Sequence, residues 1–418
     1  MNFLIKAAHI LDPSSPFHNT QQDIYVQDGI IQEIGKNLSI TNATVLKFDE
    51  LYVSQGWFDS SVSFGEPGYE ERETVEHGLK VAGLSGFTHV AYNTNTFPKP
   101  DSRADIAFLL EQAAGFVVAL HPKACITTSN NEKTLAPLRE LAASGAVSFS
   151  NHKAPICNAN TLKLALQYCS DFDGLVESFP YNSDLADGGQ MHEGAVSTVM
   201  GLNGIPSIVE EIQLKRDLGL LGYTSGKLHV PTISTAQAVQ LIKEAKNASM
   251  DVSTSVSIHN LFFTDEALKG FNPNAKLLPP LREEADVEAL RTGLVNGTID
   301  MVTSDHQPLN SELKDIELDR AAFGSLAIEH TFGALLKIFP IEDVVSFLTR
   351  GKTRFGIPAK NIEIGVQADL TLFTPKGTKT ITKESILSTS KNSLYIGEAL
   401  PGNVYGVLAQ GKALLQKV

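Results

Sequence analysis

Short apolar runs alternate with longer amphipathic stretches along the middle of the chain. Eight of the runs are typical of buried strands, and they begin near Leu51, Phe87, Phe116, Ala146, Gly174, Lys227, Asp251 and Ile299. Apolar residues recur at helical spacing over 72–84, 101–113, 132–143 and 235–248. Repeated strand–helix units imply parallel strands, and eight units predict an α/β fold closed into a (β/α)8 TIM-type barrel. A doubly wound sheet is the alternative, but no G-x-G-x-x-G follows a strand.

Both ends of the chain show a different pattern, with short strands joined by tight turns. Residues 20–35 are typical of two strands that meet at Asp28-Gly29, a common pair in two-residue hairpin turns. Residues 368–418 repeat this pattern, with a turn at Gln410-Gly411. The sequence therefore predicts one small β-sandwich domain built from both termini. The expected division is a composite sandwich from 1–53 and 362–418, with the barrel inserted at 54–361.

Composition and charge narrow the class of protein further. Apolar residues make up 42% of the 418 residues, enough for a large core. Asp and Glu (47) outnumber Lys and Arg (34), giving a net charge of −13, so neither nucleic acid nor an anionic membrane is expected as a partner. No apolar run approaches the ~20 residues of a membrane span, and the N-terminus does not resemble a signal peptide. With only three cysteines, a reducing, cytoplasmic location is expected.

Several short motifs resemble one enzyme family. They are Glu66-Pro67-Gly68 after a strand that ends in GWFD, YNTNTFP at 92–98, STA at 234–236, NAKLLPPLR at 274–282 and SDHQP at 304–308. GGQMHEG at 188–194 and GVQADLTLF at 365–373 fit the same family. In this order and over nearly the whole chain, they resemble dihydroorotase, an amidohydrolase-superfamily enzyme of pyrimidine biosynthesis. The resemblance implies a metal-dependent barrel with a terminal β-sandwich.

The resemblance also implies a zinc site at the strand ends. Zinc binds histidine nitrogens and carboxylate oxygens, and it activates a water for attack on the ring amide. The family's pattern places a His-x-His pair after the first barrel strand and single histidines after the fifth and sixth. The matching positions here are Ser61, Ser63, Phe179 and Thr232, and none of the 11 histidines forms a His-x-His pair. We therefore expect neither a metal nor another cofactor at this site.

Other positions of the family's site also differ. Gly65 replaces an arginine, Leu278 an asparagine and Leu309 a histidine that would bind substrate, and Asn151-His152 replaces a carboxylate pair. Asp305, Asn95 and the scaffold residue Arg282 match the pattern. Asp305 is the expected vestige of the catalytic site, where a lone carboxylate is still able to act as a general base. Asn95 is the expected remnant of substrate binding.

Nearby polar side chains are candidates to rebuild the site. His152 and Lys153 follow the fourth strand, where they either take a new role or lie in a solvated loop. Glu177 is expected to be a buried, hydrogen-bonded carboxylate rather than a ligand. His229 and His306 are expected to be structural.

Three hypotheses follow for function. The first is a non-catalytic dihydroorotase-like protein that acts as a structural or regulatory partner of aspartate transcarbamoylase, a role known for degenerate family members. The second is an active dihydroorotase that interconverts carbamoyl-aspartate and dihydroorotate with an atypical zinc site. The third is a hydantoinase-like or allantoinase-like relative, which also needs histidine ligands. A homo-oligomer is expected in each case.

Overall fold

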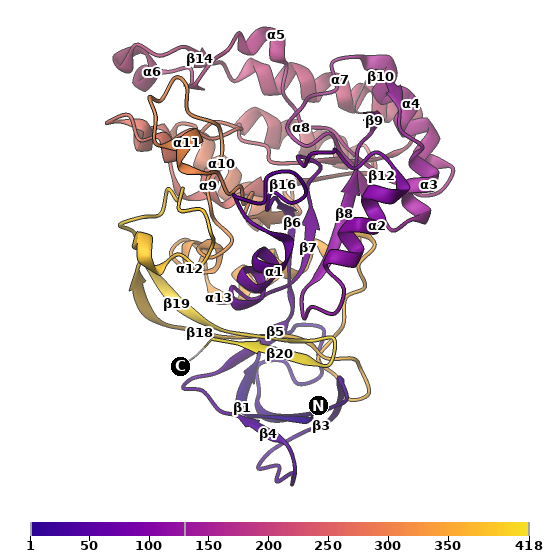
Figure 1. Cartoon of the computed structure of the whole chain (residues 1–418), viewed down its shortest axis with the longest axis vertical. Helices are drawn as coiled ribbons and strands as arrows, with labels where there is room; N and C mark the ends of the chain where they lie inside the picture. The colour runs from indigo at the N-terminus through magenta and orange to yellow at the C-terminus, as the bar shows by residue number, and fades with distance from the viewer. Residues whose placement is uncertain (1, 129–130, 417–418) are drawn as a thin grey trace.

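A ring of eight parallel strands forms the upper part of the computed structural model, which describes residues 2–128 and 131–416 (Figure 1). In order of pairing, the strands are β6 (Trp57–Val62), β7 (Phe87–Tyr92), β8 (Ala119–Ala124), β11 (Ser148–Phe149), β12 (Leu175–Glu177), β15 (Lys227–Val230), β16 (Val252–Ser257) and β17 (Met301–Thr303). The ring closes where the Ser63 amide donates to the His306 carbonyl at 2.9 Å. The predicted TIM-type barrel is therefore confirmed, and the doubly wound alternative is wrong.

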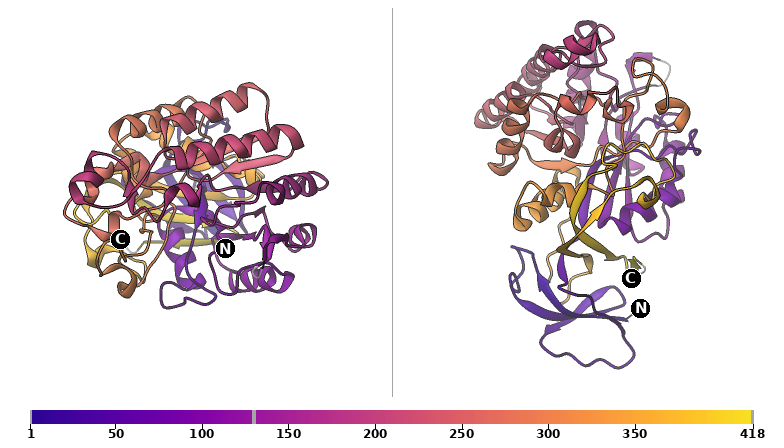
Figure 2. Two further views of the ribbon diagram at one scale, coloured as in Figure 1. Left: turned by 90° about the horizontal axis from the view of Figure 1, so that it is seen from above. Right: turned by 90° about the vertical axis from the view of Figure 1, so that its left-hand side faces the viewer.

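Helices cover the outside of the barrel (Figure 2). They include α1 (Val75–Leu84), α2 (Arg103–Gln112), α3 (Leu138–Ala143), α4 (Ala159–Ser170), α7 (Ile208–Thr224), α8 (Ala236–Asn247), α10 (Glu284–Val295) and α13 (Ile341–Thr349). Local sequence sets their starts: Ser102 and Asp105 form a capping box at α2, and Thr235 caps α8. Each such cap contributes about 1 kcal/mol. Within the described residues, no helix combines the length and apolarity that a membrane crossing requires.

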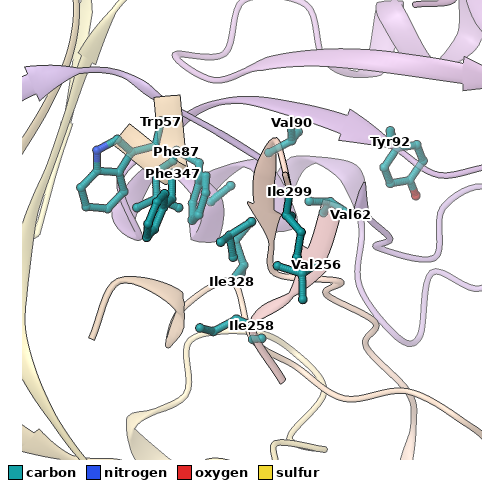
Figure 3. Close-up of a cluster of buried hydrophobic side chains, with 14 of the residues drawn as sticks. Trp57, Val62, Phe87, Val90, Tyr92, Val256, Ile258, Ile299, Ile328 and Phe347 are labelled. Carbon is teal, nitrogen blue, oxygen red and sulfur yellow. The ribbon is translucent and has the colours of Figure 1, made fainter. Parts of the chain in front are cut away.

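The main core lies between the barrel strands and these helices. Outward-facing strand residues such as Val62, Val90 and Val256 pack against a layer that includes Ile328 and Phe347 (Figure 3). Since side chains alternate along a strand, the intervening positions point into the barrel. Burying one such apolar side chain stabilises the fold by roughly 1.5–3 kcal/mol. The alternation therefore leaves the barrel interior for the polar residues described below.

Both ends of the chain build the lower β-structure. Its strands are β1 (Asn2–Ile10), β2 (Gln21–Gln27), β3 (Ile30–Gly35), β4 (Thr44–Leu46), β5 (Tyr52–Gln55), β18 (Asp369–Thr380), β19 (Ala399–Ala409) and β20 (Lys412–Leu415). The turn between β2 and β3 has positive φ at Asp28 (50°) and Gly29 (82°), the geometry expected of a tight hairpin. Gln410 and Gly411 form the corresponding turn between β19 and β20. Both predicted hairpins are confirmed.

The strand predicted from Leu51 is in fact two strands, β5 in the terminal sheet and β6 in the barrel. The chain passes from one to the other at Gly56. A Cβ atom at this position would lie 2.0 Å from the Thr88 hydroxyl oxygen and 2.2 Å from an Asp369 carboxylate oxygen. Glycine is therefore required by close packing between the two sheets, a contact that the apolar pattern does not reveal.

The helix predicted over 132–143 is also shorter than expected. Residues Asn131–Leu135 form β10, and α3 begins only at Leu138. Pro137 lies between them, and a proline disfavours the helical conformation of the residue before it. The apolar spacing across this proline therefore belongs to two elements.

Candidate functional site

A small cavity opens at the carboxyl ends of the barrel strands, where active sites of this architecture lie. Its lining consists of Ser61, Asn93, Lys123, Ser150, His152, Lys153, Glu177, Phe179, Pro231, Thr232 and Asp305. Its volume is about 10 Å³, close to the space of a single water molecule. Pockets that bind small molecules usually have volumes of roughly 300–1,000 Å³. In this structure, polar side chains fill the barrel mouth almost completely.

An ion pair between Lys153 and Asp305 dominates the cavity. The Lys153 Nζ lies 2.7 Å from Asp305 Oδ2, and the two side chains are 13% and 7% exposed. Ser61 Oγ donates to the other carboxylate oxygen, Oδ1, at 3.2 Å. Asp305 has a positive φ of 51°, so strand alternation no longer governs where its side chain points. Lys153 therefore lies in the barrel mouth, and the solvated-loop interpretation is wrong for it.

The serines at the two expected ligand positions form a hydrogen-bonded cluster. Asn93 Nδ2 donates to Ser61 Oγ and to Ser63 Oγ, in both cases at 3.1 Å. Ser63 Oγ donates in turn to Asn95 Oδ1 at 2.9 Å. Asn93 lines the cavity, whereas Asn95 does not. The side-chain amide that lines the cavity is therefore that of Asn93, and Asn95 is connected to it through Ser63.

A second ion pair lies at the base of the cavity. The Lys123 Nζ is 2.9 Å from Glu177 Oε2, and both side chains are at most 2% exposed. Ser148 Oγ donates to Glu177 Oε1 at 2.5 Å. Glu177 is therefore the buried, hydrogen-bonded carboxylate that the sequence predicts. Each carboxylate that lines the cavity is therefore paired with a lysine, so that the protein itself neutralises both negative charges.

His152 contributes an imidazole with an unused nitrogen. Its φ of 53° reverses the chain after β11, and its Nε2 is buried without a hydrogen-bond partner. Burial, together with the nearby ammonium groups of Lys153 and Lys123, holds the pKa of His152 well below its usual value. The ring is therefore neutral at pH 7. It is the one imidazole among the residues that line the cavity.

Phe179 and Thr232 complete the wall. Phe179 is buried and stacks on Tyr181 with ring centroids 5.8 Å apart. Thr232 has a φ of 51°, and its backbone amide donates to Ser255 Oγ at 3.2 Å. Both side chains face the cavity, as the strand-end positions predict. Neither offers a nitrogen or carboxylate donor to a metal.

A third carboxylate, Asp59, fixes the strand ends beneath the cavity. It accepts hydrogen bonds from the Thr303 hydroxyl and from the backbone amides of Ser61 and Ser304. Burial raises the pKa of Asp59 to about 6, although these hydrogen bonds act in the opposite direction. Asp59 therefore joins the first and last strands and does not line the cavity.

Several other residues considered from the sequence lie outside the cavity. Asn151 accepts hydrogen bonds from the backbone amides of Ile126 and Thr127, and Leu309 is buried in the wall of a separate cavity. A Cβ atom at Gly65 would lie 2.4 Å from the Tyr69 carbonyl oxygen, which excludes a side chain at this backbone position.

The two structural histidines also lie outside the cavity, as expected. His229 bonds to Ser253 and Ser255 inside the barrel, and His306 accepts from two backbone amides through Nδ1. Strand alternation alone does not explain the position of His229, because β15 ends at Val230 and does not continue to Thr232. Arg282 is fully buried and donates to Ser234 and His192, in keeping with a scaffold role.

Asn93 and Lys123 line the cavity but are not among the site residues expected from the sequence. Asn93 lies two residues before Asn95, and it shares the inward-facing parity of that strand end. Lys123 is a single lysine near the end of the third predicted barrel strand, and a charged residue in a buried strand is rare unless it is paired. The sequence therefore contained one indication for each residue: the spacing of Asn93 from Asn95, and the presence of a lysine at the end of a buried strand.

The residues around the cavity do not fit a zinc ion. Within the described ranges, 2–128 and 131–416, no three His, Cys, Asp or Glu side chains converge in a way that could hold a metal. A catalytic zinc needs about three such ligands and an open position. Among the lining residues, the free donor of this type is His152 Nε2, because Asp305 and Glu177 each neutralise an ammonium. A dication beside Lys153 would also experience direct charge repulsion.

The fold has well-matched solved relatives. The L-hydantoinase (dihydropyrimidinase) from Arthrobacter aurescens superposes with a TM-score of 0.87 at 20% identity, covering 99% of this chain and 96% of that chain. The dihydropyrimidinase from Brevibacillus agri NCHU1002 superposes with a TM-score of 0.83 at 21% identity, covering 100% and 95%. These likenesses define the class of fold: a TIM barrel with a terminal β-sandwich.

Sequence relatives narrow this class to a family. Residues 52–238 match the family model described as Dihydro-orotase-like. A dihydroorotase from Acetivibrio thermocellus is 36% identical over 423 residues, covering 99% of this chain and 99% of the relative. A dihydroorotase from Pelotomaculum thermopropionicum is 34% identical, covering 100% and 99%. The chain belongs to the dihydroorotase family.

Proposed function

We propose that this chain is a dihydroorotase-family protein in which an internal ion pair takes the place of the catalytic metal. In this proposal it neither opens nor closes the dihydroorotate ring. One observation carries the proposal: the ammonium of Lys153 lies 2.7 Å from the carboxylate of Asp305 at the barrel mouth. An ammonium provides positive charge, but it has no open coordination position and cannot lower the pKa of a bound water as zinc does.

The size and polarity of the cavity support this proposal. A volume of about 10 Å³ leaves no room for a six-membered ring unless Lys153 and its neighbours move. Asp305 accepts hydrogen bonds from Lys153 and Ser61, so a general base at this position would first have to give up an ion pair. The proposal therefore assigns the barrel mouth a structural role.

Turnover measurements test the proposal. The full-length chain is incubated with dihydroorotate, and separately with carbamoyl-aspartate, with zinc added or removed by a chelator. We expect no rate above the uncatalysed reaction, and no difference between the natural chain and Asp305→Asn. Turnover that Asp305→Asn abolishes would overturn the proposal. Turnover that persists in the Asp305→Asn variant would also overturn the proposal.

An active dihydroorotase with an atypical site is the second candidate. Sequence identity of 34–36% to proteins named dihydroorotase, along nearly the full length of the chain, favours an active enzyme. It requires Lys153 to leave Asp305 and the cavity to open. His152, with its unused Nε2, is then the group available for acid–base chemistry or metal binding. In the turnover experiment, His152→Phe would abolish the rate if this candidate is correct.

We further propose that the chain forms a homo-oligomer and associates with aspartate transcarbamoylase in pyrimidine biosynthesis. The family resemblance supports this partner. Size-exclusion chromatography with light scattering, on the chain alone and mixed with the transcarbamoylase of the same organism, measures both associations. A stable joint complex is expected. Separate elution of the two proteins at micromolar concentration would contradict the association.

A further inference from the structure

A much larger cavity lies away from the barrel mouth. It has a volume of about 580 Å³, within the range of small-molecule pockets, and it is bounded by α1, α12 (Thr331–Leu336) and the strands β18, β19 and β20. Figure 1 shows this region where the long β18–β19 hairpin rises beside α12. Its apolar wall consists of Leu84, Phe332, Ile381, Leu400, Val404 and Leu414. None of the residues assigned to the barrel mouth lines it.

A buried histidine lies in the wall of this cavity. His330 is among the lining residues and is 3% exposed, yet neither of its ring nitrogens has a hydrogen-bond partner among the described residues. A buried polar group without a partner costs about 1–3 kcal/mol, and such groups are rare in native proteins. Burial lowers the pKa of His330 to about 3, so the ring is neutral and offers one donor and one acceptor. The His330 ring therefore contributes an uncharged surface to the cavity wall.

The rim of the cavity is positively charged in an otherwise acidic protein. Lys80 on α1 and Lys379 on β18 are exposed, and neither has a carboxylate partner in the described part of the chain. The one carboxylate of the lining, Glu329, already accepts from the backbone amides of Leu387 and Ser388. His77 is similarly paired with Glu73. Two lysines are therefore available to an anion at the mouth of an apolar pocket.

We propose that this cavity is a second ligand site, which binds a small amphiphilic anion with an apolar body and a carboxylate or similar acidic head. The apolar wall takes the body, and Lys80 and Lys379 take the acidic head. This site is independent of the proposed function. Its test can therefore fail while the assignment of the barrel mouth stands.

Calorimetric titration of the full-length chain with octanoate tests the proposal. Octanoate is expected to bind once per chain, whereas octyltrimethylammonium, which has the same tail and the opposite charge, is expected to bind about tenfold more weakly or not at all. Equal binding of the two ions would overturn the proposal, because it would show that the rim does not select charge. The absence of octanoate binding at millimolar concentration would also overturn it.

Three variants locate the binding. Lys80→Ala/Lys379→Ala is expected to weaken octanoate binding about tenfold, and Leu84→Trp, which fills the partly exposed edge of the wall, is expected to abolish it. Lys163→Ala, at a half-buried lysine of α4 outside the cavity, is the control and should leave binding unchanged. Circular dichroism confirms that each variant is folded. Binding that survives both cavity variants would place octanoate elsewhere and overturn the proposal.

Discussion

Lys153 determines the electrostatics of the barrel mouth. Its ammonium is the direct partner of Asp305, and the two groups are separated by 152 positions in the sequence. Removing one member of a largely buried ion pair leaves the other charge without compensation, which usually costs about 3–5 kcal/mol. Lys153 is therefore expected to stabilise the fold even in the absence of any catalytic role.

Lys153→Met is expected to lower the free energy of unfolding by about 3 kcal/mol, because Asp305 loses its counter-charge. The double variant Lys153→Met/Asp305→Asn removes both charges and should recover most of that loss. Urea denaturation followed by circular dichroism measures both values. Lys163→Met on α4, at a half-buried lysine with no ion pair among the described residues, is the control and should change stability by less than about 0.5 kcal/mol. A stability of Lys153→Met equal to that of the natural chain would show that the ion pair is absent in solution.

The barrel and the terminal sheet approach each other closely at Gly56, where there is no space for a side chain. Gly56→Ala is expected to destabilise the fold by several kcal/mol, because its Cβ would clash with Thr88 and Asp369. Gly219→Ala is the matched control, since Gly219 lies on the exposed side of α7 and a Cβ atom there would meet nothing within 4 Å. That change should stabilise α7 by about 0.5–1 kcal/mol. Equal effects of the two changes on the melting temperature would contradict the close packing at Gly56.

Local patterns predicted the elements better than the contacts between them. The alternation of apolar runs and helical spacing indicated the barrel, and Asp28-Gly29 indicated a hairpin, because both signals act within a few residues. Pro137 marked the true start of α3, although the apolar spacing ran across it. The Lys153–Asp305 and Lys123–Glu177 pairs depend on where distant strands end, and no local pattern contains that information. His152 and Asp305 also have positive φ values, so the alternation of side chains along a strand does not predict where these two side chains point.

A buried polar cluster joins the barrel to the terminal sheet. Asp369 at the start of β18 lies 2.8 Å from the Lys352 Nζ and 3.1 Å from His89 Nε2, and His89 also bonds to His121. Burial acts to raise the pKa of Asp369, but the Lys352 ammonium and His89 outweigh it and hold that pKa well below its usual range. The two parts of the molecule therefore share one electrostatic cluster.

Lys352→Met is expected to destabilise the whole chain by about 3–5 kcal/mol, because it leaves Asp369 buried beside His89 alone. Since the cluster spans both parts, unfolding should remain a single transition at a lower urea midpoint. Fluorescence of Trp57, in the barrel, and far-ultraviolet circular dichroism should give the same midpoint. Separate midpoints would show that the terminal sheet unfolds independently, and an unchanged midpoint would show that the cluster does not stabilise the fold.

Buried neutral histidines make the whole molecule sensitive to acid. Burial lowers the pKa to about 3 for His121, His259, His306 and His330. In the unfolded chain these groups titrate near 6.5, so between about pH 6.5 and 3 the unfolded state binds more protons and stability falls as the pH falls. Each histidine contributes about 1.4 kcal/mol per pH unit within this window. Asp59 and Asp217, whose pKa values are raised to about 6 by burial, act in the opposite direction below pH 6.

The expected result is a free energy of unfolding that falls from about pH 6.5 to 5, because the histidines outnumber the two aspartates. Urea titrations at each pH measure it. His259→Phe is a suitable variant, since both nitrogens of His259 lack partners among the described residues, and it should reduce the slope by about one proton. A stability that is flat from pH 7 to 5 would contradict the buried neutral state of these rings.

The zinc content of the purified full-length chain tests the central claim most directly. The chain is expressed in zinc-supplemented medium, and its metal is counted by inductively coupled plasma mass spectrometry, beside an Asp305→Ala variant. Because Lys153 already neutralises Asp305, and because the cavity wall holds Ser61, Phe179 and Thr232, we predict far less than one zinc per chain, with no difference between the two proteins. One or more zinc ions per chain, lost in Asp305→Ala, would contradict the replacement of the metal by an ion pair.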